Sequence, residues 1–221
     1  MAHAYVFDAY GTLFDVASAA RRCSAALAGK AEALAALWRS KQLEYSWLRS
    51  LMGRHADFGE VTGDALDYAM AALGIADSDL RAKLLELYFV LDAYDDARPV
   101  LEALKRAGRA TAILSNGSPK MLAAAIDSAG LGDVLDRTLS VEEVGVFKPD
   151  RRVYALACRR LGLPAERICF VSSNGWDAAG AASFGFVAVW ANRGGAPRER
   201  LPAEPAAEIS RLDALPSLLG L

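Results

Sequence analysis

Residues 4–15 read AYVFDAYGTLFD, and this stretch decides the fold. Its apolar run from Ala4 to Phe7 predicts a short buried strand, which ends at the turn Asp8-Ala9-Tyr10-Gly11-Thr12. A buried strand is a rigid support, so it holds the Asp8 carboxylate in a fixed place. Two more apolar runs also stop at small polar residues and a glycine: Ala110 to Leu114 precedes Ser115-Asn116-Gly117, and Ile168 to Val171 precedes Ser172-Ser173-Asn174-Gly175.

Helical stretches separate these predicted strands. Residues Pro99 to Ala107 and Pro119 to Ala129 have helical character and close on Gly108 and Gly130, as helix ends often do. Strands that alternate with helices predict an α/β fold with a parallel sheet covered on both faces. Ligands of such sheets bind beyond the carboxyl ends of the strands. The polar segments that follow the three strands should therefore meet at one site.

The segment from residue 15 to residue 98 interrupts this alternation. Residues Ala31 to Leu51, Asp64 to Ala72 and Leu80 to Leu91 all show helical spacing, with no convincing strand between them. We therefore predict a helical cap domain, residues 15–98, inserted into a catalytic core made of residues 1–14 and 99–221. The tail around Ala196 to Ala207 is rich in proline and alanine and is predicted to be a loop.

The composition is that of a globular protein that binds a small molecule. The chain has 221 residues, 53% of them hydrophobic, and a net charge of only −2 from 25 basic and 27 acidic residues. This balance favours neither nucleic acid nor an anionic membrane surface as a partner. No apolar run approaches the roughly 18 residues of a membrane helix, and no signal peptide is evident. Because Cys23, Cys158 and Cys169 lack metal or redox spacing, we expect buried thiols and a cytoplasmic protein.

Four motifs in order along the chain resemble those of the haloacid dehalogenase superfamily. They are the Asp8 to Asp15 segment, Ser115-Asn116-Gly117, Phe147-Lys148-Pro149, and Ser172-Ser173-Asn174-Gly175-Trp176-Asp177. Their detailed pattern is similar to the L-2-haloacid dehalogenases in particular, and the motifs span the whole predicted core. The resemblance implies a Rossmann-like core with a helical cap.

Position 10 distinguishes two chemistries within that superfamily. Its phosphatases carry a second aspartate two residues after the nucleophile, which protonates a leaving alkoxide, whereas this chain has Tyr10. A halide is a weak base that leaves without a proton, so the sequence favours carbon–halogen cleavage. Asp177 beside Asp8 is also a poor donor set for Mg²⁺, which prefers six oxygens. We therefore expect an enzyme that uses neither a metal nor an organic cofactor.

By the resemblance, Asp8 attacks C2 of a short (S)-2-haloalkanoic acid, inverts that centre and forms an ester, which water hydrolyses to an (R)-2-hydroxy acid. Lys148 keeps Asp8 ionised and in place, and Thr12 orients its carboxylate. Asp177, together with Ser172 and Asn174, would position and deprotonate the hydrolytic water. A purely structural alternative is that Ser172 and Ser173 cap the start of a helix.

Further site residues are also taken from the resemblance. Arg39 would hold the departing halide with Asn116 and Trp176, although an arginine in that sequence context is otherwise a solvated helix residue. Tyr154 would reach Asp177 or Lys148, or else be ordinary core. Leu43, Phe58 and Trp176 would line the apolar part of the pocket, although Phe58 could equally be ordinary core of the cap. The predicted substrate-binding set comprises Ala9, Tyr10, Arg39, Leu43, Ser115, Asn116 and Trp176, with backbone amides after Ser115 placed to bind the substrate carboxylate.

Two other functions remain open from the sequence. The first is a Mg²⁺-dependent phosphatase or phosphonatase with an unusual first motif, against which Tyr10 argues. The second is a binding module that has lost catalysis, against which the retention of Asp8, Lys148 and Asp177 argues. The apolar helix from Ala31 to Leu51 also suggests a homodimer, as is usual among the proteins that the chain resembles.

Overall fold

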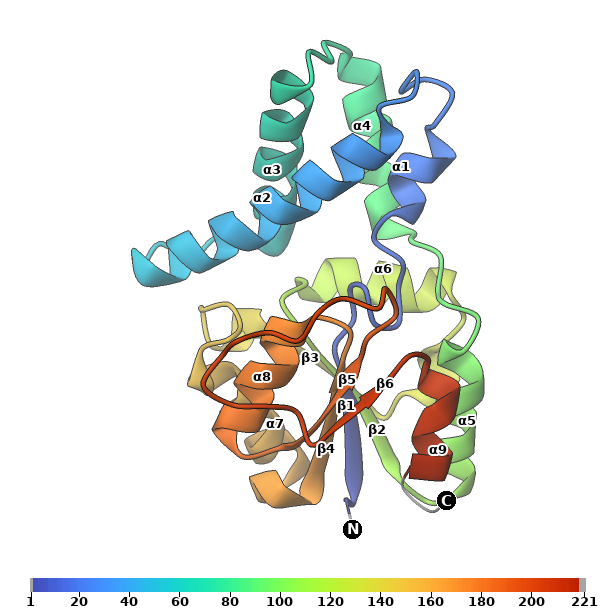
Figure 1. The fold of residues 1–221 in the computed structure, drawn as a ribbon, viewed down its shortest axis with the longest axis vertical. Helices are drawn as coiled ribbons and strands as arrows, with labels where there is room; N and C mark the ends of the chain where they lie inside the picture. The colour runs from blue at the N-terminus through green and yellow to red at the C-terminus, as the bar shows by residue number, and fades with distance from the viewer. Residues whose placement is uncertain (1, 219–221) are drawn as a thin grey trace.

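A computed structural model describes residues 2–218, and within that range the sheet has six parallel strands (Figure 1). Their order across the sheet is β3-β2-β1-β4-β5-β6. The first strand therefore lies in the middle, between β2 and β4. The bounds are β1 Ala4–Phe7, β2 Ala110–Ser115, β3 Arg137–Ser140, β4 Ile168–Ser172, β5 Val187–Ala191 and β6 Ala207–Ile209.

Helices cover both faces of this sheet. Figure 1 shows α7 and α8 on one side and α5 and α9 on the other. Parallel strands joined by helices confirm the predicted α/β class. These helices are α5 Ala97–Arg106, α6 Pro119–Ser128, α7 Arg151–Leu161, α8 Gly175–Phe184 and α9 Leu215–Leu218, with short 3-10 turns at Gly132–Val134, Val141–Glu143, Ala165–Arg167 and Leu212–Ala214.

The first four of the helices that lie between β1 and β2 in the chain form a separate group beyond the carboxyl ends of the strands (Figure 1). The longest of them, α2, packs along α3 and buries the side chains of Leu34, Trp38, Gln42 and Ser46. These residues are four apart and so lie on one face of the helix. The four helices are α1 Ser18–Arg22, α2 Ala31–Leu51, α3 Phe58–Ala72 and α4 Ser78–Phe89.

The chain passes between the helical group and the sheet twice, and the two passages are hydrogen-bonded together. The Asp15 N–H donates to the Asp92 carbonyl at 2.8 Å, and the Tyr94 N–H donates to the Leu13 carbonyl at 2.9 Å. Phe14 and Ala93 form an antiparallel bridge between these bonds. The turn that follows Asp8 is therefore tied directly to the segment that returns from the helices.

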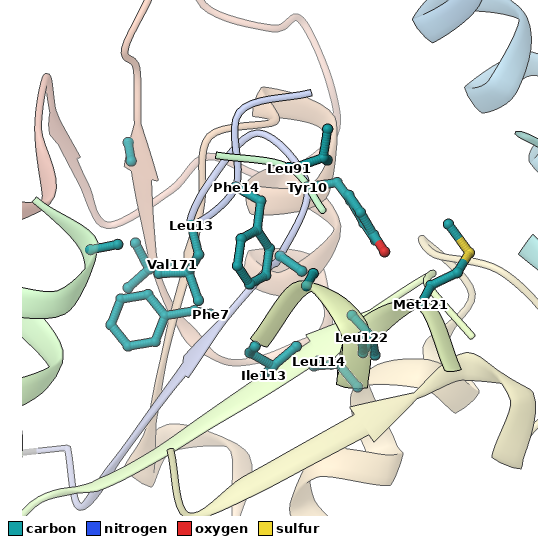
Figure 2. Close-up of a cluster of buried hydrophobic side chains, with 14 of the residues drawn as sticks. Phe7, Tyr10, Leu13, Phe14, Leu91, Ile113, Leu114, Met121, Leu122 and Val171 are labelled. Carbon is teal, nitrogen blue, oxygen red and sulfur yellow. The ribbon is translucent and has the colours of Figure 1, made fainter. Parts of the chain in front are cut away.

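The core surrounds β1, whose four residues are all buried. Figure 2 shows Phe7 near Val171 of β4, and Phe14 above Ile113 of β2. Full burial of each such side chain stabilises the fold by roughly 1.5–3 kcal/mol. The strand that carries Asp8 is thus held by packing on both sides.

Several elements differ from the sequence prediction. Strands β3, β5 and β6 and helix α1 were not predicted, and α3 begins at Phe58 instead of Asp64. The Asp57 carboxylate accepts the Gly59 N–H at 2.6 Å and so fixes this earlier start. The predicted loop at the tail ends where β6 begins. All three cysteines are free thiols, but Cys158 is only partly buried.

Within residues 2–218, no helix combines the length and the apolar character that crossing a bilayer would require.

Candidate functional site

Asp8 lies directly beyond the central strand, where the order of the strands reverses direction. Phe7, the last residue of β1, stands opposite Ile113 of β2 and Val171 of β4. The polar residues that follow β2 and β4 therefore flank Asp8, as the sequence predicted. In parallel sheets this reversal point is the usual place for a ligand.

A buried ammonium lies between two carboxylates at this point. The Lys148 Nζ is 2.9 Å from Oδ1 of Asp8 and 2.8 Å from Oδ2 of Asp177. The side chain of Lys148 is only 1% exposed, that of Asp8 8% and that of Asp177 0%. Lys148 thus contacts both carboxylates directly, and its predicted role at Asp8 stays a prediction.

One ammonium cannot fully compensate two buried carboxylates, and the shifted pKa values of Lys148 and Asp177 reflect this. Burial lowers the pKa of Lys148, but the charges of Asp177 and Asp8 outweigh it, so the net shift is upward. Burial also raises the pKa of Asp177, and the Asp8 charge acts in the same direction against the opposing effect of Lys148. Lys148 therefore stays charged, whereas Asp177 takes up a proton more readily than an exposed aspartate.

Both oxygens of Asp8 are held. Its Oδ2 accepts the Asn174 Nδ2–H at 2.9 Å and the Thr12 hydroxyl at 3.3 Å. The Thr12 hydroxyl is itself held by the Ser173 N–H at 2.8 Å. The turn back to Thr12 is organised by the Ala9 carbonyl, which accepts the Thr12 N–H at 3.2 Å. The carboxylate thus has a fixed orientation, as a nucleophile requires.

Tyr154 fixes Asp177 from helix α7. Its hydroxyl donates to Oδ1 of Asp177 at 2.8 Å, so each Asp177 oxygen has a partner. Burial, reinforced by the nearby Asp177, raises the pKa of Tyr154 well above its ordinary value, so the phenol stays protonated. Gly180 leaves room for this hydroxyl, because a Cβ there would lie 2.6 Å from it. Tyr154 thus contacts Asp177, while its ring is also buried in the hydrophobic core.

Arg39 reaches this site from helix α2. Its Nη2 donates to Oδ1 of Asn174 at 3.2 Å and to the Tyr10 carbonyl at 3.4 Å. Asn174 therefore contacts Arg39 through its oxygen and Asp8 through its nitrogen. Arg39 is thus not a solvated helix arginine.

The Tyr10 ring forms an apolar wall beside the nucleophile. It stacks on Tyr88 with ring centroids 5.6 Å apart and lies 5.9 Å from the ring of Phe58. Its hydroxyl is buried and has no hydrogen-bond partner among residues 2–218, and Figure 2 shows it pointing toward Met121. Burial raises the pKa of Tyr10 well above its ordinary value. A phenol of this kind is a poor substitute for the carboxylic acid of a phosphatase.

Other predicted residues make more local contacts. The Ser115 hydroxyl accepts the Gly117 N–H at 3.0 Å, so that amide is already engaged, and the Ser172 hydroxyl accepts the Asn174 N–H at 3.2 Å. The Ser172 contact lies in the turn before α8 and caps no amide of that helix, whose N-cap residue is Asn174. Asn116 Oδ1 accepts the Lys148 N–H at 3.0 Å. Half-buried residues complete the set: Leu43 lies on α2, and Trp176 packs edge-on against Trp47 of α2 with ring centroids 5.4 Å apart.

Comparison with known proteins identifies the family. The model of the haloacid dehalogenase-like hydrolases matches residues 2–185. (S)-2-haloacid dehalogenase 1 of Pseudomonas sp. (strain CBS-3) is 49% identical over 217 residues, which cover 98% of this chain and 96% of that protein. This chain belongs to the (S)-2-haloacid dehalogenases.

Further (S)-2-haloacid dehalogenases agree in sequence and in structure. The enzyme named 4A from Burkholderia cepacia is 47% identical, over 98% of this chain and 94% of its own length. The solved L-2-haloacid dehalogenase of Xanthobacter autotrophicus with chloropropionic acid covalently bound superposes with a TM-score of 0.90 at 42% identity, covering 100% of this chain and 99% of that one. The predicted family is thereby confirmed, and with it a hydrolase that acts on carbon–halide bonds.

The residues that contact the site but were not predicted include Gln42 and Arg193. Gln42 accepts a hydrogen bond from Arg39 at 2.7 Å, and Arg193 donates to the Thr12 carbonyl at 2.9 Å. Gln42 had one detectable signal, its spacing of three residues from Arg39 on a predicted helix. Arg193 also had a signal, because the apolar run Val187–Ala191 precedes Asn192-Arg193-Gly194, but this run was not predicted as a strand.

Proposed function

We propose that this protein hydrolyses short (S)-2-haloalkanoic acids to (R)-2-hydroxy acids, with Asp8 as the nucleophile. The observation that carries this proposal is the fixed Asp8 carboxylate, held by Lys148 on one oxygen and by Asn174 and Thr12 on the other. In the first step an Asp8 oxygen bonds to C2 as the halide leaves with the bonding electrons. Attack opposite the halide inverts C2 and produces an ester.

In the second step, water attacks the carbonyl carbon of the Asp8 ester. The C2–O bond stays intact, so the hydroxy acid carries away an Asp8 oxygen, and the water oxygen enters the regenerated carboxylate. Asp177 takes a proton from the water and returns it to the alkoxide oxygen of the departing hydroxy acid. We propose that Asn174 and Ser172 position that water. Ester formation removes the charge of Asp8, which eases the ionisation of Asp177 because the two charges repel.

The departing halide and the substrate carboxylate need separate partners. We assign the halide to Arg39, Asn116 and Trp176, since Arg39 already reaches Asn174 beside the nucleophile. We assign the carboxylate to backbone amides after Ser115. The wall of Tyr10 and Phe58, extended by Leu43 and Ala9, suits the small apolar part of the substrate.

We further propose that no metal takes part. In support, the Lys148 ammonium lies within 3 Å of both carboxylates and supplies a positive charge at that position. The Tyr10 phenol is also no substitute for the acid that a leaving alkoxide requires. A Mg²⁺-dependent phosphatase therefore finds no support at this position.

The oligomeric state and the location of the protein are also proposals. We propose a homodimer formed through the exposed apolar end of α2, where Leu51 and Met52 are 84% and 67% exposed. We place the protein in the cytoplasm, which suits its free thiols.

The decisive experiment is halide release from (S)- and (R)-2-chloropropionate with EDTA present. Wild type should release chloride from the (S) isomer alone, and Asp8→Asn should release none. Asp79→Asn, at an exposed aspartate of α4, is the matched control and should behave as wild type. Chloride that appears only when Mg²⁺ is added, or none from either isomer, would refute the proposal.

The position of bond cleavage has its own test. In a single turnover with enzyme in excess in ¹⁸O-labelled water, the product should contain no label, because its new oxygen comes from Asp8. The label should appear in Asp8 and only reach product in later turnovers. Labelled product in the first turnover would mean that water attacks C2 directly.

A further inference from the structure

A buried amide in the helical group stands directly behind Arg39. Gln42 lies three residues after Arg39 on α2 and is 1% exposed. Its side chain is enclosed by Thr62 of α3 and Tyr88 of α4, both also buried. A buried amide must satisfy its hydrogen bonds inside the protein, so its partners determine what it does.

The neighbouring hydroxyl determines which way this amide faces. The Thr62 hydroxyl is 2.6 Å from the Phe58 carbonyl, which can only accept, so Thr62 donates there. Thr62 must therefore accept the hydrogen bond that joins it to Gln42, 2.7 Å away, and the atom of Gln42 at that contact is Nε2. The other end of the amide, Oε1, then faces Arg39, whose Nη1 lies 2.7 Å away.

Tyr88 reinforces the same arrangement. Its hydroxyl lies 3.0 Å from Nε2 and 3.2 Å from Oε1 of Gln42. Burial raises the pKa of Tyr88, so this hydroxyl stays neutral. The amide is thereby held at both ends, and Arg39 is offered a fixed acceptor.

All the hydrogen bonds that Arg39 makes within residues 2–218 go to neutral oxygens, those of Gln42, Asn174 and the Tyr10 backbone. A carboxylate would fix a guanidinium equally well, but it would also cancel its charge. A neutral acceptor fixes the guanidinium and leaves its full positive charge for another anion. Because Arg39 is partly buried, its attraction for an anion is much stronger when its charge is uncompensated than when a carboxylate neutralises it.

We propose that Gln42 is a positioning residue that holds the Arg39 guanidinium at the nucleophile while leaving its charge uncompensated for the departing halide. The inference rests on the proposed function, because it concerns the halide that Asp8 displaces. Gln42 itself touches neither substrate nor halide. Its effect should therefore depend on how much help the leaving group needs.

The test compares two leaving groups in Gln42→Glu, which keeps the shape but places a negative charge against Arg39. The quantity measured is kcat/KM for (S)-2-chloropropionate and (S)-2-bromopropionate, which reports the steps up to halide departure. For the chloro substrate we expect a loss on the order of tenfold or more, as when one stabilising donor is lost. The loss for bromide, a better leaving group, should be smaller, so the bromo-to-chloro ratio should rise. Inhibition by added bromide should weaken in parallel.

Lys41→Gln is the matched control, because it makes the same change of net charge at the neighbouring position. Lys41 pairs with Glu44 at 2.7 Å and lies over the Tyr68 ring, away from the nucleophile. This variant should keep the wild-type ratio of the two substrates. If Lys41→Gln changes the bromo-to-chloro ratio of kcat/KM as much as Gln42→Glu does, the effect comes from the change in net charge alone, and the inference is overturned.

A merely structural role for Gln42 predicts a different outcome. It would lower kcat/KM for both substrates by the same factor and leave bromide inhibition unchanged, and that result would overturn the inference. If Gln42→Glu does not fold, as judged by circular dichroism, Thr62→Val serves instead, since it removes the hydroxyl that fixes the amide. An unchanged ratio in a folded Thr62→Val would then overturn the inference. A wild type that releases halide from neither substrate would instead refute the proposed function itself.

Discussion

Asp8 and Asp177 share one ammonium, yet their surroundings suit them to different tasks. Asp8 is held through both oxygens by three polar side chains, those of Lys148, Asn174 and Thr12. Asp177 is the more deeply buried of the two, and its pKa is raised by burial and by the Asp8 charge. A nucleophile should be ionised at the outset, whereas a base should bind a proton strongly when it is needed. The two environments therefore match the proposed order of steps.

The pH dependence of turnover should show this difference. Asp177 must be ionised to accept a proton, so activity should fall on the acid side, with a midpoint above the ordinary carboxyl value of 3.8. Tyr154→Phe removes a hydrogen bond that lowers the pKa of Asp177. The acid limb of kcat should then move to higher pH, by up to about one unit. On the alkaline side, Lys148 should stay charged beyond its ordinary value of 10.5.

Tyr68→Phe, at an exposed tyrosine of α3, is the control for this pH profile and should leave it unchanged. An acid limb that moves to lower pH in Tyr154→Phe, or does not move, would show that Asp177 is not the titrating base. Rapid quenching adds a second readout, since slower hydrolysis should let the Asp8 ester accumulate.

Sequence reasoning found the residues that motifs carry and missed those that only tertiary contacts bring to the site. Asp8, Lys148 and Asp177 follow strands or sit in ordered motifs, and the structure brings all three into contact. Gln42 and Arg193 act through partners 20 or more residues away in the chain, such as Thr62 and Thr12. Because β5 was not predicted as a strand, the contact of Arg193 with Thr12 was not foreseen, whereas the spacing of Gln42 from Arg39 was a local signal that the prediction did not use. The Ser115 and Ser172 hydroxyls are placed in local turns, so their predicted roles stay predictions.

Among the elements, continuous apolar runs led to the prediction of three strands, while a fourth such run, β5, was overlooked. Strands β1, β2 and β4 are continuous apolar runs that end in polar residues, and they were predicted. Strand β3 begins with two exposed residues, and β6 has three residues within a proline-rich tail, so neither gives an apolar run. The start of α3 was obscured by Gly59 and Gly63, which have low helix propensity.

The segments that join the helical group to the sheet are clamped by a buried ion pair. Arg193, in the loop after β5, donates to both oxygens of Asp96, at 2.7 and 3.0 Å, and to the Thr12 carbonyl. The Asp96 side chain is 0% exposed and also accepts the Leu212 N–H at 2.8 Å. The pair thus joins the returning segment to the turn that follows Asp8.

Arg193→Met should destabilise the protein by about 3–5 kcal/mol, because it leaves the Asp96 charge buried without its partner. Burial opposes ionisation of Asp96, but the bonds from Arg193 and Leu212 hold its pKa below 3.8. A lowered carboxyl pKa contributes stability that is present above pH 3.8 and is lost as the pH falls through the folded value. The loss of stability in Arg193→Met should therefore have its full size at neutral pH and become smaller in acid. Urea unfolding at several pH values measures both effects.

Arg211→Met, at the exposed pair with the neighbouring Asp95, is the control for the clamp. Exposed ion pairs contribute little, so this variant should unfold close to wild type. An Arg193→Met protein as stable as the Arg211→Met protein would mean that the clamp does not hold the segments together.

At the scale of the molecule, the helical group closes over the site through contacts spread along α2 and the loop after it. Arg39 reaches Asn174, Ser50 accepts the Phe147 N–H at 3.1 Å, and His55 lies 3.0 Å from Glu142. Because Asp8 and Lys148 are buried beneath these contacts, we expect the helices to move away from the sheet when substrate enters. The exposed end of α2 is therefore a place where a second copy of the chain would influence opening.

The proposed dimer places the exposed apolar residues of that end against their copies. The double variant Leu51→Glu and Met52→Glu puts charges into this surface, where they would be desolvated or repel one another, and should yield monomers. Light scattering coupled to size-exclusion chromatography gives the mass directly: wild type should weigh twice the 23.6 kDa of the chain and the double variant once. Leu201→Glu, at a 44% exposed leucine in the loop before β6, is the control and should remain dimeric. Because the dimer surface adjoins α2, the monomer should fold but show an altered KM. A wild type that elutes as a monomer at all concentrations would exclude the dimer and leave the chemistry at Asp8 unaffected.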